Sequence, residues 1–223
     1  MPQQINKKIF LILVILFILG TFSNKNIGST SFLKNGNFKI KDLSNFENKK
    51  LRQDLSKLKN QNLFFLSKEK VLAILNSNEI VESSYIFKKY PTHLNVKIWK
   101  TNFLAITKNE GKDYYIGSNG NLIKVEDEKI DLPFIFGDIE ISEFLKLKKI
   151  MNDFNFNYQS IQNLYYFKSK RWDLETKEGL LIRLPSKNLE KSFKILLNIL
   201  NDADLNNFTN IDLRNNNQVI ISG

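Results

Sequence analysis

The chain has 223 residues, of which 42% are hydrophobic and 25% are charged, and this composition is typical of a folded globular protein. It has no cysteine and one histidine, which excludes disulfide frameworks, thiolate nucleophiles and metal sites built from several histidines. The net charge is +10, but the lysines are scattered and form neither a tight basic block nor an RNA-binding motif, so we expect no nucleic-acid partner.

An uncharged apolar run, IFLILVILFILGTF, occupies residues 9–22 and follows Lys7 and Lys8. It would give about 21 Å of helix, which is shorter than a bilayer core of about 30 Å and also suits a cleaved signal peptide. A cleavage site needs small residues at its exit, and Phe22 interrupts that pattern. We therefore expect an uncleaved signal-anchor over residues 9–24, with a short cytoplasmic tail and a large exported part.

The first folded elements are predicted after a polar linker over residues 25–35. The segment NFKIKDL alternates apolar and polar residues and predicts a short strand. The segment ENKKLRQDLSKLKN predicts a helix, because Leu51, Leu55 and Leu58 recur at helical spacing. Ser67 suits the N-cap of a second helix.

Two extended runs follow, IVESSYIFKK and HLNVKIWK. In the second run Leu94, Val96 and Ile98 occupy one face and Trp99 the other, which predicts a strand with one face on a core. Pro91 lies between the runs, where its missing N–H interrupts no strand pairing. The predicted order is strand, helix, helix, strand, strand, and two helices can cover one face of such a three-stranded sheet.

This order, with the pattern V-x-S-S-x-I-x-K-x-x-P-x-x-L-x-V-x-I, resembles a POTRA domain of the bacterial cell-division family FtsQ/DivIB. Later pieces resemble the same family in order and spacing: IGSNGNLI with its Asn-Gly turn, LPFIFG, RWDL, GLLIRL and IDLR before a last strand. The chain departs from the family at Lys100 and Thr101, where an acidic residue and an arginine are usual, and at Gly117, where the family has aspartate.

The resemblance implies an α+β fold with a single N-terminal transmembrane helix, a β-α-α-β-β POTRA domain and a second mixed α/β domain whose sheet is largely antiparallel. The expected boundaries are residues 1–8 for the cytoplasmic tail, 9–24 for the transmembrane signal-anchor, 25–35 for the linker, 36–101 for the POTRA domain and 102–223 for the FtsQ-type β domain.

Nothing in the sequence predicts catalysis, a cofactor or a metal. His93 has no second histidine or cysteine with which to converge, so we interpret it as a solvent-facing turn residue. No nucleophile elbow, Walker loop or zinc-protease motif occurs. Trp172 matches a tryptophan of the family and is interpreted as structural. Trp99 can be a hot spot for a partner, although an aromatic residue at such a place more often belongs to the core or covers a neighbouring domain.

The last strand is the best candidate site. A strand that ends a sheet leaves one side of its backbone unpaired for strand addition by a partner, although a central or shielded strand fits the pattern equally well. The resemblance favours the edge, because FtsQ proteins bind the FtsB–FtsL complex in this region by strand addition, helped by basic residues. The predicted partner-binding residues are Lys170, Arg171, Arg214, Asn215, Asn217, Gln218, Val219, Ile220 and Ile221.

The resemblance thus implies a non-enzymatic, bitopic scaffold of the division machinery. It would be a single-pass type II protein of the cell inner membrane at the division septum, mostly periplasmic, with FtsB/FtsL-like partners and room for other division proteins at the POTRA domain. The alternative is another POTRA-bearing module for envelope assembly or secretion that binds extended peptides. A third interpretation, a basic binder of nucleic acid or anionic lipid, would lose affinity steeply with salt, whereas strand addition would not.

Overall fold

The computed structural model describes the chain in segments that leave out Pro91 and Asn217, among others. These segments are residues 7–22, 38–40, 45–58, 63–90, 93–125, 130–202, 208–215 and 218–223. The chain divides into two compact units. The first consists of Met1–Leu75 and Ser84–Lys97, and the second of Asn76–Ser83 and Ile98–Gly223.

Helix α1 (Lys7–Phe22) contains the apolar run expected to be helical. It ends two residues before the expected boundary of the signal-anchor at residue 24. Within the described ranges, no helix has the length and apolar character needed to cross a membrane. The signal-anchor therefore stays a prediction.

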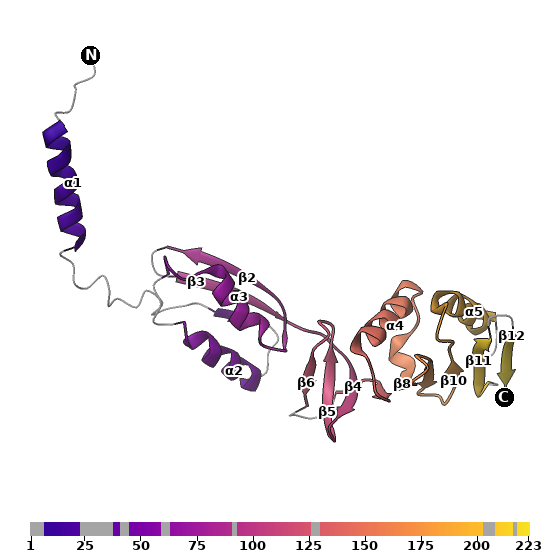
Figure 1. The fold of residues 1–223 in the computed structure, drawn as a ribbon. Helices are drawn as coiled ribbons and strands as arrows, with labels where there is room; N and C mark the ends of the chain where they lie inside the picture. Colours follow the sequence, from indigo (N-terminus) through magenta and orange to yellow (C-terminus); the bar gives the residue numbers. More distant parts are fainter. Residues whose placement is uncertain are drawn as a thin grey trace, which may run out of the picture. The chain divides into compact units, whose positions relative to one another are not determined.

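The next elements follow the predicted order of strand, helix, helix, strand, strand (Figure 1). They are β1 (Phe38–Ile40), α2 (Asn45–Ser56), α3 (Lys68–Asn76), β2 (Val81–Lys89) and β3 (His93–Lys100). The strands form a three-stranded sheet in the order β1-β3-β2. The backbone N–H of Lys70 donates to the Ser67 hydroxyl at 3.1 Å, which confirms Ser67 as the cap of α3.

Strand β3 shows the one-sided burial that its alternating sequence predicts. Leu94, Val96 and Ile98 are almost completely buried. Trp99, which belongs to the opposite face, is 43% exposed. The leucines of α2 and the segment after it, Leu51, Leu55 and Leu58, are also buried, as their helical spacing predicted.

The second unit contains a nine-stranded sheet in the order β12-β11-β10-β9-β8-β7-β4-β5-β6. Its elements are β4 (Phe103–Asn109), β5 (Lys112–Gly117), β6 (Leu122–Lys124), β7 (Phe134–Phe136), α4 (Ile141–Asp153), η1 (Tyr158–Ser160), β8 (Ile161–Tyr166), β9 (Trp172–Thr176), β10 (Leu181–Arg183), α5 (Leu189–Asp202), β11 (Asn210–Asn215) and β12 (Gln218–Ser222). The sheet is largely antiparallel, as predicted, and the pairs β4–β7, β7–β8 and β10–β11 are parallel.

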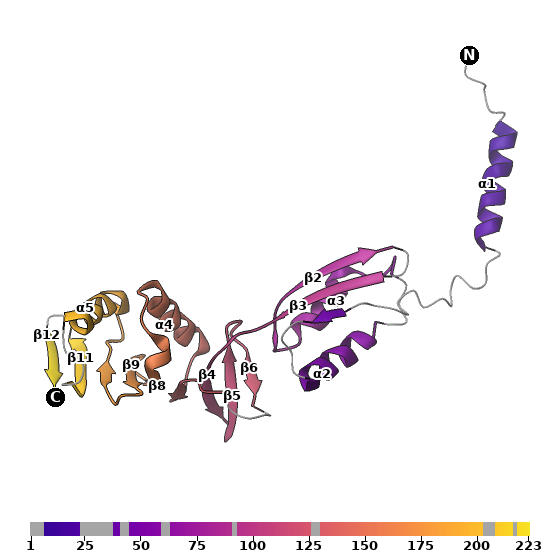
Figure 2. The same ribbon diagram turned by 180° about the vertical axis from the view of Figure 1, so that it is seen from behind.

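Helices α4 and α5 lie on the same face of this sheet (Figures 1 and 2). The strand register brings a row of aliphatic residues to that face, and all of them are buried: Ile135, Leu164, Leu174, Ile182 and Ile211. Trp172 is 1% exposed, with its ring 4.7 Å from that of Tyr166 and 6.4 Å from that of Phe144 in α4. Its predicted structural role agrees with this burial.

The turn between β5 and β6 is hydrogen-bonded to the start of strand β2. The Asn119 side-chain amide donates to the backbone carbonyls of Glu79, at 2.9 Å, and of Val81, at 3.1 Å. A Cβ atom on Gly117 would lie only 2.5 Å from Asn119 Oδ1 and 2.7 Å from Thr101 Oγ1. A side chain at position 117 would therefore clash with these two side chains.

Candidate partner-binding site

Strand β12 ends the nine-stranded sheet, so no other described strand pairs with its outer side. It pairs in antiparallel register with β11, where Ile221 faces Ile211 and Ile220 faces Asp212. Val219 packs against the hydrophobic core, whereas Ile220 is 52% and Ile221 40% exposed. Of the two arrangements that the sequence left open, the structure shows the edge strand. It combines exposed apolar side chains with a backbone side to which no other described strand pairs.

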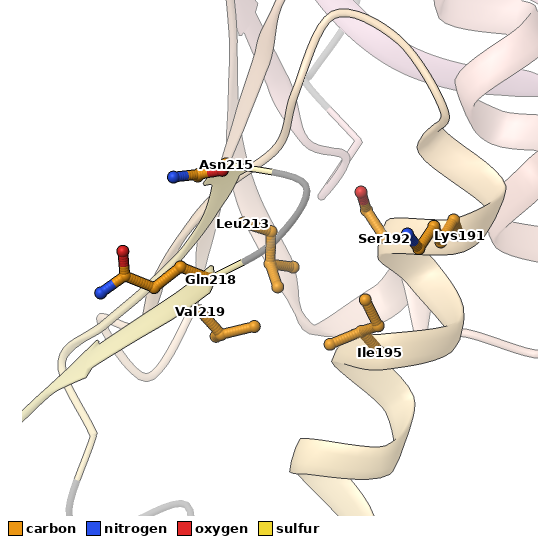
Figure 3. Close-up of a pocket in the computed structure, with 7 residues that line it drawn as sticks. All are labelled: Lys191, Ser192, Ile195, Leu213, Asn215, Gln218 and Val219. Atoms are coloured by element: carbon orange, nitrogen blue, oxygen red, sulfur yellow. The ribbon is translucent and has the colours of Figure 1, made fainter.

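A pocket of about 130 Å³ lies between this edge and helix α5 (Figure 3). The side chains of Leu213, Val219 and Ile195 converge on it, whereas those of Asn215 and Gln218 point away. An apolar cavity of about 150 Å³ can hold benzene, so this pocket has room for a branched aliphatic group or much of an aromatic ring. Its other lining residues are Lys191 and Ser192.

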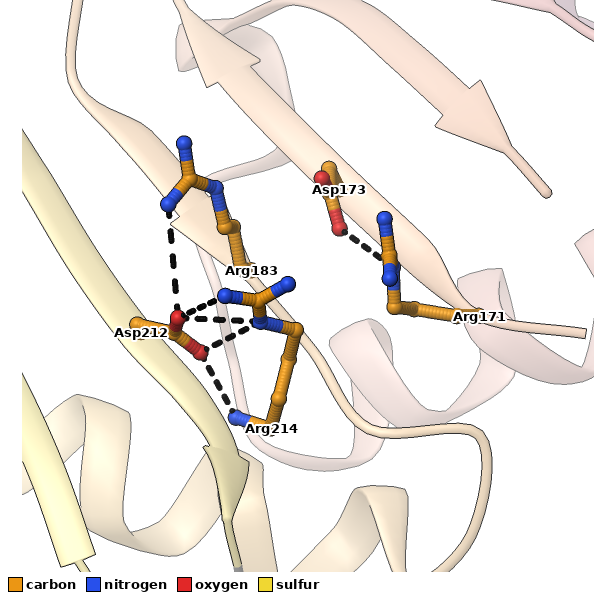
Figure 4. A network of polar contacts seen from close by, with 5 residues as sticks. All are labelled: Arg171, Asp173, Arg183, Asp212 and Arg214. Atoms are coloured by element: carbon orange, nitrogen blue, oxygen red, sulfur yellow. Dashed lines mark hydrogen bonds and ion pairs between the residues drawn. The ribbon is translucent and has the colours of Figure 1, made fainter. Parts of the chain in front are cut away.

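The opposite face of the sheet carries charged residues near the same edge. The strand register aligns Asp173 of β9 with Arg183 of β10, and Arg183 with Asp212 of β11. Side chains at paired positions of adjacent strands point to the same face. Arg171 and Arg214 flank this row, so three arginines and two aspartates form one cluster, which we call the arginine cluster (Figure 4).

Asp212 is the centre of the arginine cluster. Its two carboxylate oxygens each accept a hydrogen bond from Arg214 Nε at 2.9 Å, and the Arg214 backbone N–H donates to Oδ1 at 3.0 Å. Arg183 Nη1 lies 4.0 Å from Oδ2. The hydrogen bond from the Arg214 side chain holds the pKa of Asp212 below its usual value. Asp212 therefore keeps Arg214 in one orientation beside the edge strand.

Asp173 has a different environment in the same cluster. Arg171 Nε lies 3.3 Å from Asp173 Oδ1, an ion pair without hydrogen-bond geometry. The Arg171 guanidinium also lies over the Phe167 ring, 4.1 Å from its centroid. Burial raises the pKa of Asp173, and the positive charges of Arg171 and Arg183 only partly offset that effect. With both aspartates ionised, three guanidinium groups leave the cluster one net positive charge.

The structure separates the predicted site residues into two groups. Arg171 and Arg214 belong to the arginine cluster, and Asn215, Gln218, Val219, Ile220 and Ile221 lie on β11 and β12. Lys170 lies apart, because its backbone adopts a φ of 59° in the turn before β9 and its Nζ lies 3.4 Å from Glu140 Oε1. Asn217 lies outside the described residues.

Sequence reasoning missed Arg183 and the α5 residues that line the pocket. Alternation in GLLIRL places Arg183 and Ile182 on different faces of the sheet. Only the strand register shows that Arg183 is paired with Asp212 on the neighbouring strand. Ile195 lies outside the apolar stripe that Phe193 and Leu196 define, and both of those residues are completely buried. The described residues include no group of three or more His, Asp or Glu side chains placed to bind a metal ion.

The second unit matches a protein family. The model described as "Cell division protein FtsQ/DivIB, C-terminal" matches residues 105–214. The chain is 24% identical over 188 residues to the cell division protein FtsQ of Rickettsia bellii, which covers 82% of this chain and 69% of that protein. The chain belongs to the FtsQ/DivIB family. It is a cell-division protein, and the resemblance predicted from its motifs is confirmed.

The comparison with known proteins gave two further matches. The FtsQ protein of Bradyrhizobium diazoefficiens is 26% identical over 140 residues, which are 60% of this chain and 40% of that protein. A solved extracytoplasmic domain of DivIB from Geobacillus stearothermophilus aligns with 48% of this chain and 99% of its own, at 10% identity and a TM-score of 0.32. The family match includes the whole arginine cluster and ends before strand β12.

Proposed function

We propose that this FtsQ/DivIB protein is a non-enzymatic scaffold that recruits an FtsB/FtsL-like partner by strand addition to β12. The observation that carries the proposal is the open edge of β12, with the pocket on one face of the sheet and the arginine cluster on the other. Backbone groups of the edge would pair with an extended segment of the partner.

The two faces of the sheet at this edge predict which kinds of side chain the partner segment carries. Neighbouring residues of a strand point to opposite faces, so one residue of an added strand reaches toward the pocket and the next toward the arginine cluster. The pocket, converging on Leu213, Val219 and Ile195, suits an apolar side chain. The net positive charge beside Arg214 suits a carboxylate, which would set register more than raw affinity. The partner segment should therefore place an apolar and an acidic residue at adjacent positions.

Membrane anchoring by α1 is part of the same proposal. The apolar run over residues 9–22 supports a single-pass type II topology, with the bulk of the chain periplasmic at the division septum. Confinement to the membrane raises the effective concentration of membrane-bound partners, so that weak contacts at the edge suffice for recruitment. Further division proteins would bind the POTRA domain.

Two proline substitutions in the full chain test strand addition. Successive N–H groups of a strand point to opposite sides, so of Ile220→Pro and Ile221→Pro one removes a donor to β11 and the other an outward donor. We expect the outward substitution to leave unfolding by urea unchanged and to reduce co-purification of an FtsB/FtsL-like partner at least tenfold. Two variants that both fold and both bind as well as the parent chain would contradict the proposal.

Charge and salt provide the matched controls. Arg214→Gln should weaken binding because it removes the cluster's charge nearest the edge, whereas Lys187→Gln, at an exposed position outside the cluster, should not.

Raising the salt concentration should weaken binding only modestly, since most of the pairing is between backbone groups. A steep fall with salt would instead indicate a polyanion binder. A fluorescent fusion spread evenly around dividing cells would contradict the septal location.

A further inference from the structure

Three aromatic side chains of the first unit form an exposed patch that the proposed edge does not use. Phe64 and Phe65 lie in the turn before α3, and Tyr90 follows strand β2. Phe65 is 88% exposed, and Phe64 and Tyr90 are also more than half exposed. Single exposed aromatic residues are ordinary in proteins, but here two of the rings, Phe64 and Tyr90, are in contact and Phe65 is next to Phe64 in sequence, which concentrates apolar surface in water.

Buried and hydrogen-bonded residues fix the turn that carries Phe64 and Phe65. The Phe64 and Tyr90 rings are in contact, with centroids 4.8 Å apart. Leu63 and Leu66, which bracket the two phenylalanines, are completely or almost completely buried. Lys88 Nζ donates to the Leu66 carbonyl and so joins β2 to the same turn. The buried leucines hold the turn while the phenylalanine rings face solvent.

The charged residues that neighbour the patch in sequence are mainly lysines. Lys68 and Lys70 begin α3 directly after the turn, and Lys89 precedes Tyr90; all three are exposed. Glu69 is the acidic residue in that first turn of α3. Segments that lie at the lipid headgroup layer typically combine aromatic residues with lysines. Their rings enter the membrane interface and their ammonium groups contact anionic lipids.

We propose that the patch of Phe64, Phe65 and Tyr90 rests on the surface of an anionic phospholipid membrane. The proposal rests on the anchoring by α1 proposed above, which would keep the patch near that surface. Fifteen residues, 23–37, separate α1 from β1, and they span at most about 50 Å when extended. So short a tether gives a high effective concentration of membrane surface, and a weak contact suffices.

Nitroxide labelling of the full chain tests the proposal directly, because the chain has no cysteine of its own. Phe65→Cys, Phe17→Cys and Lys187→Cys would each carry one spin label in chains reconstituted into vesicles of phosphatidylethanolamine and phosphatidylglycerol. Collision rates with oxygen, which enters the bilayer, and with a polar nickel chelate, which does not, then report the depth of each label. Position 65 tolerates the change because its side chain is exposed, and circular dichroism checks the fold.

We expect the label at position 65 to collide with oxygen severalfold more often, relative to the nickel chelate, than the label at position 187. A position-65 label that behaves like the position-187 label would overturn the proposal, and a protein partner would then be the occupant to seek. The label at position 17 reports the anchor separately. If it lies in the bilayer while position 65 stays in water, the lipid contact alone is wrong.

Discussion

Replacing Gly137 by alanine should destabilise the second unit strongly. Gly137 ends the segment LPFIFG with a φ of +109°, a conformation that residues with a side chain rarely adopt. A Cβ atom there would lie 2.2 Å from the backbone oxygen of Tyr166, far inside van der Waals contact. That oxygen belongs to β8, whose Tyr165 pairs with Phe136 of β7, so it cannot move away without disturbing the sheet.

The expected loss has two parts. A residue held in an unfavourable backbone conformation costs about 1–3 kcal/mol, and forcing an extra methyl group into a packed site costs about 1–3 kcal/mol more. We therefore expect Gly137→Ala to lower the free energy of unfolding by about 2–6 kcal/mol, a large fraction of the roughly 5–15 kcal/mol typical of domains. Gly179→Ala is the matched control, because Gly179 has a φ of +87° and a Cβ atom added there would meet no atom within 4 Å. Gly179→Ala should lower the free energy of unfolding only by the cost of the unfavourable backbone conformation.

Unfolding in urea, followed by the fluorescence of Trp172, measures both variants. Trp172 is buried beside Tyr166, so its emission reports this part of the sheet. A Trp99→Phe background removes the exposed second tryptophan. Equal shifts of the urea midpoint for Gly137→Ala and Gly179→Ala would refute the close approach between Gly137 and Tyr166 as the cause.

Three further predictions concern the core and the polar residues of the sheet. Trp172→Ala should lower the free energy of unfolding by about 3–5 kcal/mol, measured by circular dichroism in urea, because it removes a fully buried aromatic side chain. The lowered pKa of Asp212 means that its ionised form stabilises the fold above about pH 4, and that this contribution is lost as the pH falls through the folded-state pKa. Asp212→Asn should therefore reduce the free energy of unfolding at neutral pH and make it fall less on acidification. Urea titrations at a series of pH values measure both effects. Tyr165→Phe should raise the pKa of Glu175, followed by NMR titration, because the Tyr165 hydroxyl donates to its carboxylate at 2.6 Å and is the main cause of the lowered value.

Elements with a strong local period could be predicted from the sequence. The alternation in HLNVKIWK predicted the strand over residues 93–100 with its buried face, because side chains of a strand alternate between faces. The leucines of ENKKLRQDLSKLKN were placed correctly because a helix brings every third or fourth residue to one side. The family motifs added the order of the later elements, which local patterns alone left uncertain.

Polar partnerships could not be predicted in the same way. Lys170 and Arg171 are neighbours in sequence, yet the first pairs with Glu140 and the second with Asp173, because a positive φ at Lys170 turns the chain between them. Asn119 reaches carbonyl groups about forty residues away, and no local signal marks that contact. Such pairs depend on which segments the fold brings together.

Local patterns were enough to predict strands and helices such as β3 and α2, their apolar faces, and the family that carries this arrangement. These properties follow from periods of two and 3.6 residues and from motif order, so short segments of the chain contain them. The position of β12 at the end of the sheet, the pocket between it and α5, and the meeting of Arg171, Arg183 and Arg214 on one face emerged only from the folded chain. Strand order and register depend on pairing between distant segments and on how the helices pack over them, and no single segment encodes either.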